Sequence, residues 1–408
     1  MKVFQGWRVV AACFVIAAFS WGLGLFGASV YLQAVTAAHG WAIGEVASAI
    51  TLFFVVSALV QRTVGRSIDR WGPRPVLTLG AMSMSLGVGL VGQVSAPWQL
   101  YPCFVLIGIG WSTMSTTGIA ATVAPWFERH QGRSMTLAMM GASVGAIIGV
   151  PLLLSTVGRL GLGPGLVVAG AVAATVLLPL VGRALRFRGP SDIGERRDGD
   201  LPADAGAPAT ALAPPRSAGM RRALLWSATA GFALGLTVQI GFITHHVVLA
   251  APLLGATGAG LLVSATGGAA LVGRLVLARI VDRVDVRRLA GLIMVLQTVS
   301  LLALAAVPTV PVLVGASLVY GYGIGHVTTL GPVVVRREFG AAAFGATYGS
   351  AATVIQLTSA FGPALFGWLR DSFGGYGPGL VVAALLTSAG FLVLIVGGAI
   401  DRRVQPAG

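Results

Sequence analysis

The sequence predicts an all-α membrane protein with twelve transmembrane helices, arranged as two pseudo-symmetric six-helix bundles. The first observation behind this prediction is composition: of 408 residues, 56% are hydrophobic and 10% are charged. A soluble domain carries about 25% charged residues, so this chain has too few to coat a globule of its size. The second is that long apolar stretches recur along the chain, as spanning helices require. The third is an internal repeat, which divides these stretches six and six.

Each stretch is long enough to cross the roughly 30 Å hydrocarbon core of a bilayer. The twelve expected spans cover residues 7–35, 42–64, 75–94, 98–123, 133–157, 163–186, 222–250, 256–280, 287–307, 310–334, 342–367 and 376–400. The first is too long for a cleavable signal peptide, so we interpret it as a span. Cys13 and Cys103 both lie within spans. This placement predicts buried free thiols and argues against a disulfide framework or a zinc site.

The segment from Phe187 to Met220 differs from the rest of the chain. It combines acidic residues and arginines with a run of proline and alanine, which predicts a solvated, disordered linker. We therefore expect an N-terminal half over residues 1–186, a cytoplasmic linker over 187–221 and a C-terminal half over 222–408.

Basic residues predict the orientation. If both termini are cytoplasmic, the inner side receives Lys2 and 23 arginines, and the outer side receives only Arg159 and Arg370. Such a bias sets topology in membrane proteins, so we expect a multi-pass protein of the cell inner membrane. The net charge of +14 would suggest nucleic acid for a soluble protein. Here the charge borders apolar spans, so the expected surroundings are a lipid bilayer, with no nucleic acid partner.

Two repeated segments support the division into halves. Residues 163–169 recur unchanged as residues 377–383, at an offset of 214, and Asp69-Arg70 recurs as Asp282-Arg283, at an offset of 213. Repeated six-helix units about an axis normal to the membrane describe one transporter architecture, in which the site lies near the midplane between the halves.

The segment from Gly65 to Arg74 resembles the G-x-x-x-D-R-x-G-x-R loop of the major facilitator superfamily. The resemblance extends over nearly the whole chain and implies the major facilitator fold. It also implies that these loops gate the pathway, through Asp69, Arg70 and Arg74 in the first copy and Asp282 and Arg283 in the second. The second copy has Ala278 at the glycine position, so we expect it to form the weaker contact of the two.

Two further segments are similar to monocarboxylate and oxalate:formate-type carriers. They are Trp126–Arg133, which has the pattern W-F-x-x-x-x-G-R, and Gly6–Val10; the turn at 367–376 is similar too. The resemblance implies a secondary transporter of a small organic monocarboxylate (lactate- or pyruvate-like), coupled to protons and working by alternating access. The alternative is a carrier or exporter of another solute, such as a drug, a neutral compound or a larger organic anion. The spans contain no catalytic constellation, so we expect neither an enzyme nor a cofactor or metal.

Arg274 is the candidate for binding the substrate. An arginine inside a span costs about 2.5–3.5 kcal/mol on insertion scales, and a guanidinium binds a carboxylate in a bidentate manner. The alternative is that Arg274 reaches the interface or pairs with a helix end. No carboxylate lies deep in any span, which disfavours a cationic substrate. The resembling carriers also place a substrate-binding arginine in span 8. In this chain Ala270, one turn earlier, is not acidic, so the route of proton coupling is open.

The remaining candidates are polar or aromatic residues within spans. A histidine can titrate near neutral pH, so His245 or His246 could bind substrate or carry a proton, and helical spacing lets only one of them face the cavity. Span 11 contains no lysine or arginine, which favours a monocarboxylate over a dicarboxylate. A small polar pocket could further include Tyr320, Tyr322, Trp111, Ser115, Thr116 and Gln356. For each of these, helix packing is the alternative, and we expect His326 to be structural.

Overall fold

The computed structural model describes residues 4–199, 218–339 and 341–404. The described chain folds into two compact units. The first comprises residues of Met1–Ala205 together with Ile243–Ala251 and Gly255–Ser264, and the second comprises residues of Gly206–Phe242, Pro252–Leu254 and Ala265–Gly408. Regular structure in the described ranges is entirely helical, as the sequence predicts.

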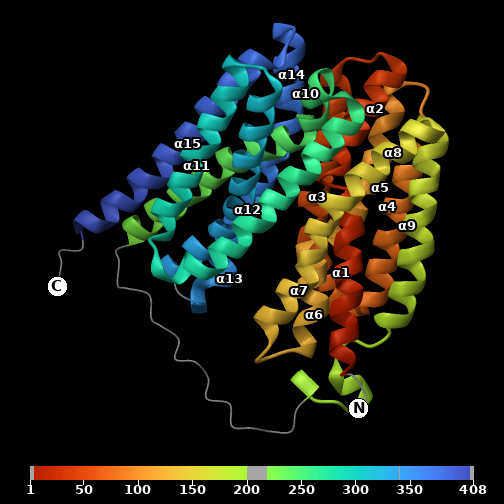
Figure 1. The fold of residues 1–408 in the computed structure, drawn as a ribbon. Coiled ribbons are helices and arrows are strands. Elements are labelled where there is room, and N and C mark those ends of the chain that lie inside the picture. The colour runs from red at the N-terminus through yellow and green to blue at the C-terminus, as the bar shows by residue number, and fades with distance from the viewer. Residues whose placement is uncertain (1–3, 200–217, 340, 405–408) are drawn as a thin grey trace. The chain divides into compact units, whose positions relative to one another are not determined.

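The first unit is a bundle of long apolar helices joined by short turns (Figure 1). Within it, α4 packs against α5 and α9, α1 packs against α7, and α3 packs against α5. Its helices are α1 (Gln5–Leu23), α2 (Gly27–His39), α3 (Ile43–Trp71), α4 (Pro73–Val91), α5 (Leu100–Met114), α6 (Thr116–Val123), α7 (Gln131–Val144), α8 (Val150–Leu160) and α9 (Leu162–Ala184).

Three spans of the first unit are interrupted. The first span breaks at Gly24 between α1 and α2, and the fourth breaks at Ser115, whose backbone is extended between α5 and α6. The fifth contains a π-helical turn, Gly145–Gly149, between α7 and α8. These interruptions leave the expected spans at 7–35, 98–123 and 133–157 in place.

The chain continues through α10 (Ala218–Ile280), which runs on for 63 residues across a kink. The kink lies at Gly255, whose φ of 69° is left-handed and suits glycine, and Pro252 precedes it. At 1.5 Å per residue, a straight helix of this length would measure about 95 Å, three times the bilayer core. The helix therefore accounts for two spans, seven and eight.

The second unit contains the rest of α10 and five further helices. They are α11 (Val286–Ala306), α12 (Val310–Phe339), α13 (Ala341–Ser359), α14 (Gly362–Phe373) and α15 (Tyr376–Val404). In this unit α11 packs against α15 and α12, and α12 packs against α13 (Figure 1). Large apolar side chains such as Leu292, Trp368 and Leu385 are exposed, as expected for surfaces that face lipid.

The described residues contain eleven helical segments that are long and apolar enough to cross a membrane. One of these is the kinked α10, so its two arms raise the number to the twelve spans that the sequence predicts. The linker was expected to be disordered, but its first part contains regular structure. Residues 190–193 and 197–199 form short 3-10 turns. Residues 200–217 lie outside the described residues, and α10 already begins at Ala218.

Candidate functional site

The predicted substrate residues are divided between the two units. Trp111, His245 and His246 belong to the first unit, and Arg274, Tyr320, Tyr322 and Gln356 belong to the second. The two histidines are adjacent on α10 and are almost fully buried, with exposed fractions of 1% and 2%.

Trp111 on α5 forms part of an aromatic cluster. Its ring centroid lies 4.7 Å from that of Trp21 and 6.1 Å from that of Phe53. The indole also lies against Gly24, where α1 breaks, and a Cβ added there would collide with the ring. Packing against a helix break is thus one demonstrated role of Trp111, and Ser115 lies at the corresponding break between α5 and α6.

Arg274 and Tyr322 lie where α10 crosses α12. The two helices approach closely because glycines occupy the crossing: a Cβ added to Gly325 would lie only 3.0 Å from the backbone nitrogen of Arg274. A Cβ added to Gly273 would lie 3.0 Å from Nδ1 of His326. The structure therefore brings the backbone of Arg274 against the same helix that carries Tyr322 and His326. The Arg274 side chain itself is partly buried.

His326 and Tyr322 are in contact on α12. The His326 ring is fully buried, with its centroid 4.7 Å from that of Tyr322, and its Nδ1 lies 3.0 Å from the Tyr322 carbonyl oxygen. Among the described residues, its Nε2 has no hydrogen-bond partner. Packing within the helix accounts for one ring nitrogen, as the sequence predicts, but burial without a second partner is costly for a polar nitrogen.

Tyr320 is directed elsewhere. Two residues before Tyr322 on the same helix, it is fully buried against Phe242, with ring centroids 4.2 Å apart. Its hydroxyl has no partner within the described ranges of the chain. Helical geometry separates residues two positions apart by about 200°, so Tyr320 and Tyr322 cannot face the same neighbour.

Gln356, the remaining candidate, lies on α13 and is partly buried.

The first copy of the expected gate is exposed to solvent. Asp69 and Arg70 end α3, and Arg74 lies in the first turn of α4, all with exposed side chains. Arg70 lies over the ring of Trp71, 5.6 Å from its centroid. In the part of the chain that the structure describes, no ion pair joins these three residues to one another. Gly72 between them has a φ of 85°, which a glycine readily adopts.

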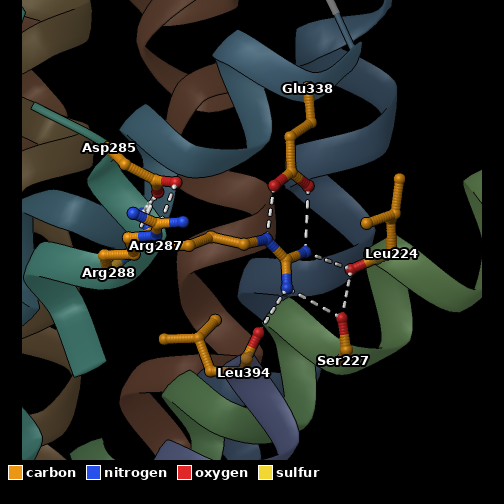
Figure 2. A network of polar contacts seen from close by, with 7 residues as sticks. All are labelled: Leu224, Ser227, Asp285, Arg287, Arg288, Glu338 and Leu394. Atoms are coloured by element: carbon orange, nitrogen blue, oxygen red, sulfur yellow. Dashed lines mark hydrogen bonds and ion pairs between the residues drawn. The ribbon is translucent and has the colours of Figure 1, made fainter. Parts of the chain in front are cut away.

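The second copy is organised around Arg287, a residue that the sequence reading did not single out. Arg287 begins α11 and is 4% exposed. Its guanidinium forms a two-pronged ion pair with Glu338 at the end of α12, in which Nη2 lies 2.9 Å from Oε2. The other donors reach the Ser227 hydroxyl at 3.0 Å and the carbonyl oxygens of Leu394 and Leu224 at 2.7 and 2.9 Å (Figure 2).

All five guanidinium donors of Arg287 are therefore satisfied, the condition under which a buried charge is tolerated. The contacts join α10, α11, α12 and α15. Space for the side chain comes from two glycines of α15: a Cβ on Gly398 would lie 2.8 Å from Cδ of Arg287, and a Cβ on Gly397 would lie 3.2 Å from Nη1.

Neighbouring contacts hold the same turn. Asp285 caps α11 by accepting hydrogen bonds from the backbone nitrogens of Arg287 and Arg288, and Arg337 donates to the carbonyl oxygens of Val281 and Val284. Arg283 is exposed, and the side chain of Asp282 lies outside the described residues. The polar contacts at this turn are made by residues other than Asp282 and Arg283, so the expectation of a weaker contact between those two stays a prediction. The sequence did contain a signal for Arg287. It lies 213 residues after Arg74, which is the offset of the repeat, so the two arginines occupy equivalent positions.

Two sequence motifs that are far apart in the chain meet in the first unit. The ring of Trp7, at the start of α1, lies 4.9 Å from that of Phe127, and the guanidinium of Arg133 lies 5.8 Å from the Trp7 ring centroid. Phe4 packs edge-on against Trp126 and Phe127. The W-F-x-x-x-x-G-R segment and the N-terminal Gly6–Val10 segment are thus two sides of one aromatic and cationic cluster.

Most of the sequence matches a family model, in two overlapping parts. The model is that of the Major Facilitator Superfamily, and it matches residues 10–258 and 240–407. The chain belongs to this superfamily. Membership makes it a multi-pass membrane transporter rather than an enzyme. Among the described residues, no three His, Cys, Asp or Glu side chains lie together as a metal site would need.

Individual relatives are distant. Human monocarboxylate transporter 11 is 26% identical over 96% of this chain and 82% of its own length. The oxalate:formate antiporter of Oxalobacter formigenes is 28% identical over 40% of the chain, and a multidrug resistance protein MdtH of Yersinia enterocolitica is 29% identical over 27%. The chain spans only 38% and 27% of the length of the last two.

Among solved structures, a bacterial homologue of the human lysosomal transporter Spinster, in an inward-facing and occupied conformation, matches with a TM-score of 0.67. It is 13% identical and covers 98% of this chain and 96% of its own. The likeness extends over both units and confirms the major facilitator fold.

Proposed function

We propose that this superfamily member transports a small organic monocarboxylate, lactate- or pyruvate-like, by alternating access, and that Arg274 binds the carboxylate. The relative with the longest match among those named above is a monocarboxylate transporter by name, and a shorter match is an oxalate:formate antiporter. Both names refer to organic acids. The observation that carries the proposal is the position of Arg274.

Arg274 lies on α10, six residues before the helix ends at Ile280, and its backbone packs on α12 beside Tyr322. A guanidinium in such surroundings is a strong receptor for one carboxylate because its paired N–H groups match the two oxygens. We propose Tyr322 as the second contact, with His245, His246, Tyr320, Gln356 and Trp111 as further contributors to the substrate pathway.

Proton coupling is part of the proposal, with His245 or His246 as the proton carrier. Ala270 occupies the position one turn before Arg274, so an acidic neighbour on this helix is not available. Imidazole is the side chain whose unperturbed pKa allows its charge to change near neutral pH. Gating by Asp69, Arg70, Arg74, Asp282 and Arg283 is proposed as well, and we add Arg287 and Glu338 to the second copy.

We further propose that the chain lies in the cell inner membrane with both termini in the cytoplasm. The distribution of arginine supports this orientation, since Arg159 and Arg370 are alone on the opposite side. The loops that carry the gating residues are then cytoplasmic.

The decisive experiment is uptake of labelled L-lactate and pyruvate into proteoliposomes, with and without an inward proton gradient. Arg274→Ala should abolish uptake, because in this proposal the Arg274 guanidinium balances the substrate charge. Arg279→Ala is the matched control: it removes an exposed arginine from the same helix and should leave uptake within about twofold, as surface changes usually do. Uptake that persists in Arg274→Ala would refute the assigned role of this residue.

A second candidate is a carrier of a neutral solute or drug, which the short match to a multidrug resistance protein favours. The same variants distinguish it. Transport of an uncharged compound should survive Arg274→Ala, because no carboxylate needs to be balanced. Absence of lactate and pyruvate uptake by folded protein, together with uptake of a neutral compound, would favour this candidate.

A further inference from the structure

The segment that follows α9 is folded, although its composition predicts disorder. The carboxylate of Asp192 accepts a hydrogen bond from the backbone nitrogen of Arg188 at 2.8 Å, and the backbone nitrogen of Glu195 donates to the carbonyl oxygen of Pro190 at 2.9 Å. Leu185 and Pro190 are buried. Local hydrogen bonds of this kind give a polar segment a defined path.

The same segment lies against two loops of the first unit. The Arg188 side chain packs on Gly72, the glycine between α3 and α4, where an added Cβ would lie 3.1 Å from Nε. Gly189 lies next to Pro125, which precedes α7. Figure 1 shows these turns at the end of the unit where α1 begins.

Asp198 forms the most specific of these contacts. Its carboxylate accepts hydrogen bonds from three successive backbone nitrogens: Oδ2 from Glu128 and Arg129, both at 3.0 Å, and Oδ1 from His130 at 3.2 Å. Successive N–H groups that point to one place form an anion-binding nest. Here the anion comes from the chain itself, 68 to 70 residues later.

The backbone of Asp198 is adapted to this contact. Its φ of 63° is the only positive value for a non-glycine residue among the described residues. Aspartate tolerates this region better than most residues, but it is still uncommon and needs support from surrounding contacts. The nest immediately precedes α7, whose positive N-terminal end also favours a carboxylate nearby. The ion pair between Arg197 and Glu128, at 3.8 Å, is exposed and adds little.

We propose that residues 185–199 form a strap that fastens the loop at 124–130 to the end of α9, with Asp198 as its anchor. The strap also contacts Gly72, so the ends of α3, α4, α7 and α9 are held together on one side of the first unit. They would then move as one body when the transporter changes conformation. This inference does not depend on the identity of the solute.

Hydrogen exchange on the full-length protein in detergent micelles tests the strap directly. Asp198→Ala removes both oxygens that accept the three hydrogen bonds, so the backbone amides of residues 128–130 should exchange about tenfold faster. Glu195→Ala is the matched control because it removes the same charge from an exposed position of the same strap. It should leave these amides unchanged.

Peptides from α11 report whether each variant is still folded. Their exchange should be the same in the wild type and in the Asp198 and Glu195 variants. If Asp198→Ala loosens the whole chain, Asp198→Asn replaces it, because asparagine keeps the shape and one acceptor oxygen; several-fold faster exchange at 128–130 is then expected. Equal exchange at 128–130 in the wild type, the Asp198 variant and Glu195→Ala would overturn the strap.

Discussion

The turn between α3 and α4 and the turn between α10 and α11 carry an arginine at the same repeat position, yet its surroundings differ completely. Arg74 is exposed in the first turn of α4. Arg287 is buried, with five donors bound and a carboxylate from α12 as partner (Figure 2). One repeated residue is therefore a surface charge in one unit and the centre of a packed network in the other.

The difference shows that a repeated arginine does not determine its own energetic role. Burial of a guanidinium requires a charged partner on another helix, which is Glu338 here. It also requires space for the side chain, which Gly397 and Gly398 provide. Removing one partner of a buried pair leaves an uncompensated charge, whereas an exposed charge is replaced by water. In the first unit, Asp198 instead accepts hydrogen bonds from backbone N–H groups of another loop, residues 128–130.

The largest effect is expected from Arg287→Ala. It breaks the two-pronged ion pair with Glu338, whose side chain is 13% exposed, so the free energy of unfolding should fall by about 3–5 kcal/mol. Arg74→Ala, its counterpart in the repeat, should change it by about 0.5 kcal/mol or less. Unfolding by SDS in mixed micelles measures both. Equal losses for the two variants would show that burial of Arg287 does not distinguish the turns.

A smaller effect is expected from crowding the same network. Gly397→Ala places a methyl group against Ser227 and the Arg287 guanidinium, so it should destabilise by about 1–3 kcal/mol. Gly182→Ala is the control, since Gly182 lies in α9 with open space around it. That change should stabilise by up to about 1 kcal/mol because alanine favours helix. The same SDS titration measures both, and stabilisation by both would argue against tight packing at Gly397.

The smallest effect is the pH dependence of the strap. Partial burial raises the pKa of the Asp198 carboxyl, but the three backbone N–H donors and nearby His130 outweigh this, and the net pKa lies below the ordinary value. A lowered pKa means that the contact is fully stabilising above the ordinary aspartate value, about 4, and is lost only as pH falls through the lowered one. After correction for intrinsic rates, protection of amides 128–130 should be constant from pH 8 to 5. A loss of protection between pH 7 and 5 would assign the contact to another group.

The positions of the spans could be predicted because an apolar run of bilayer length is a local property of the chain. The twelve expected ranges match the observed helices to within a few residues over most of their length. The kink at Gly255 falls between the spans expected at 222–250 and 256–280. The helix itself continues across this division.

The polar contacts could not be predicted in the same way. Glu338 lies beyond the span expected at 310–334, and only the packing of α12 against α11 shows that it meets Arg287. The strap was missed because its acceptors and donors are about 70 residues apart and because a left-handed aspartate leaves no pattern in composition. Periodicity alone does separate Tyr320 from Tyr322, which the structure places on different faces of α12.

The meeting of Trp7 with Phe127 and Arg133 has a consequence for biosynthesis. The start of α1 leaves the ribosome before its partner loop, which follows about 120 residues later. At 5–20 residues per second, the first span waits at least about 6 seconds for that contact, and Asp198 emerges later still. A nascent chain that is arrested before residue 126 should therefore expose Phe4 and Trp7, a state that chaperones or the insertion machinery would have to shelter.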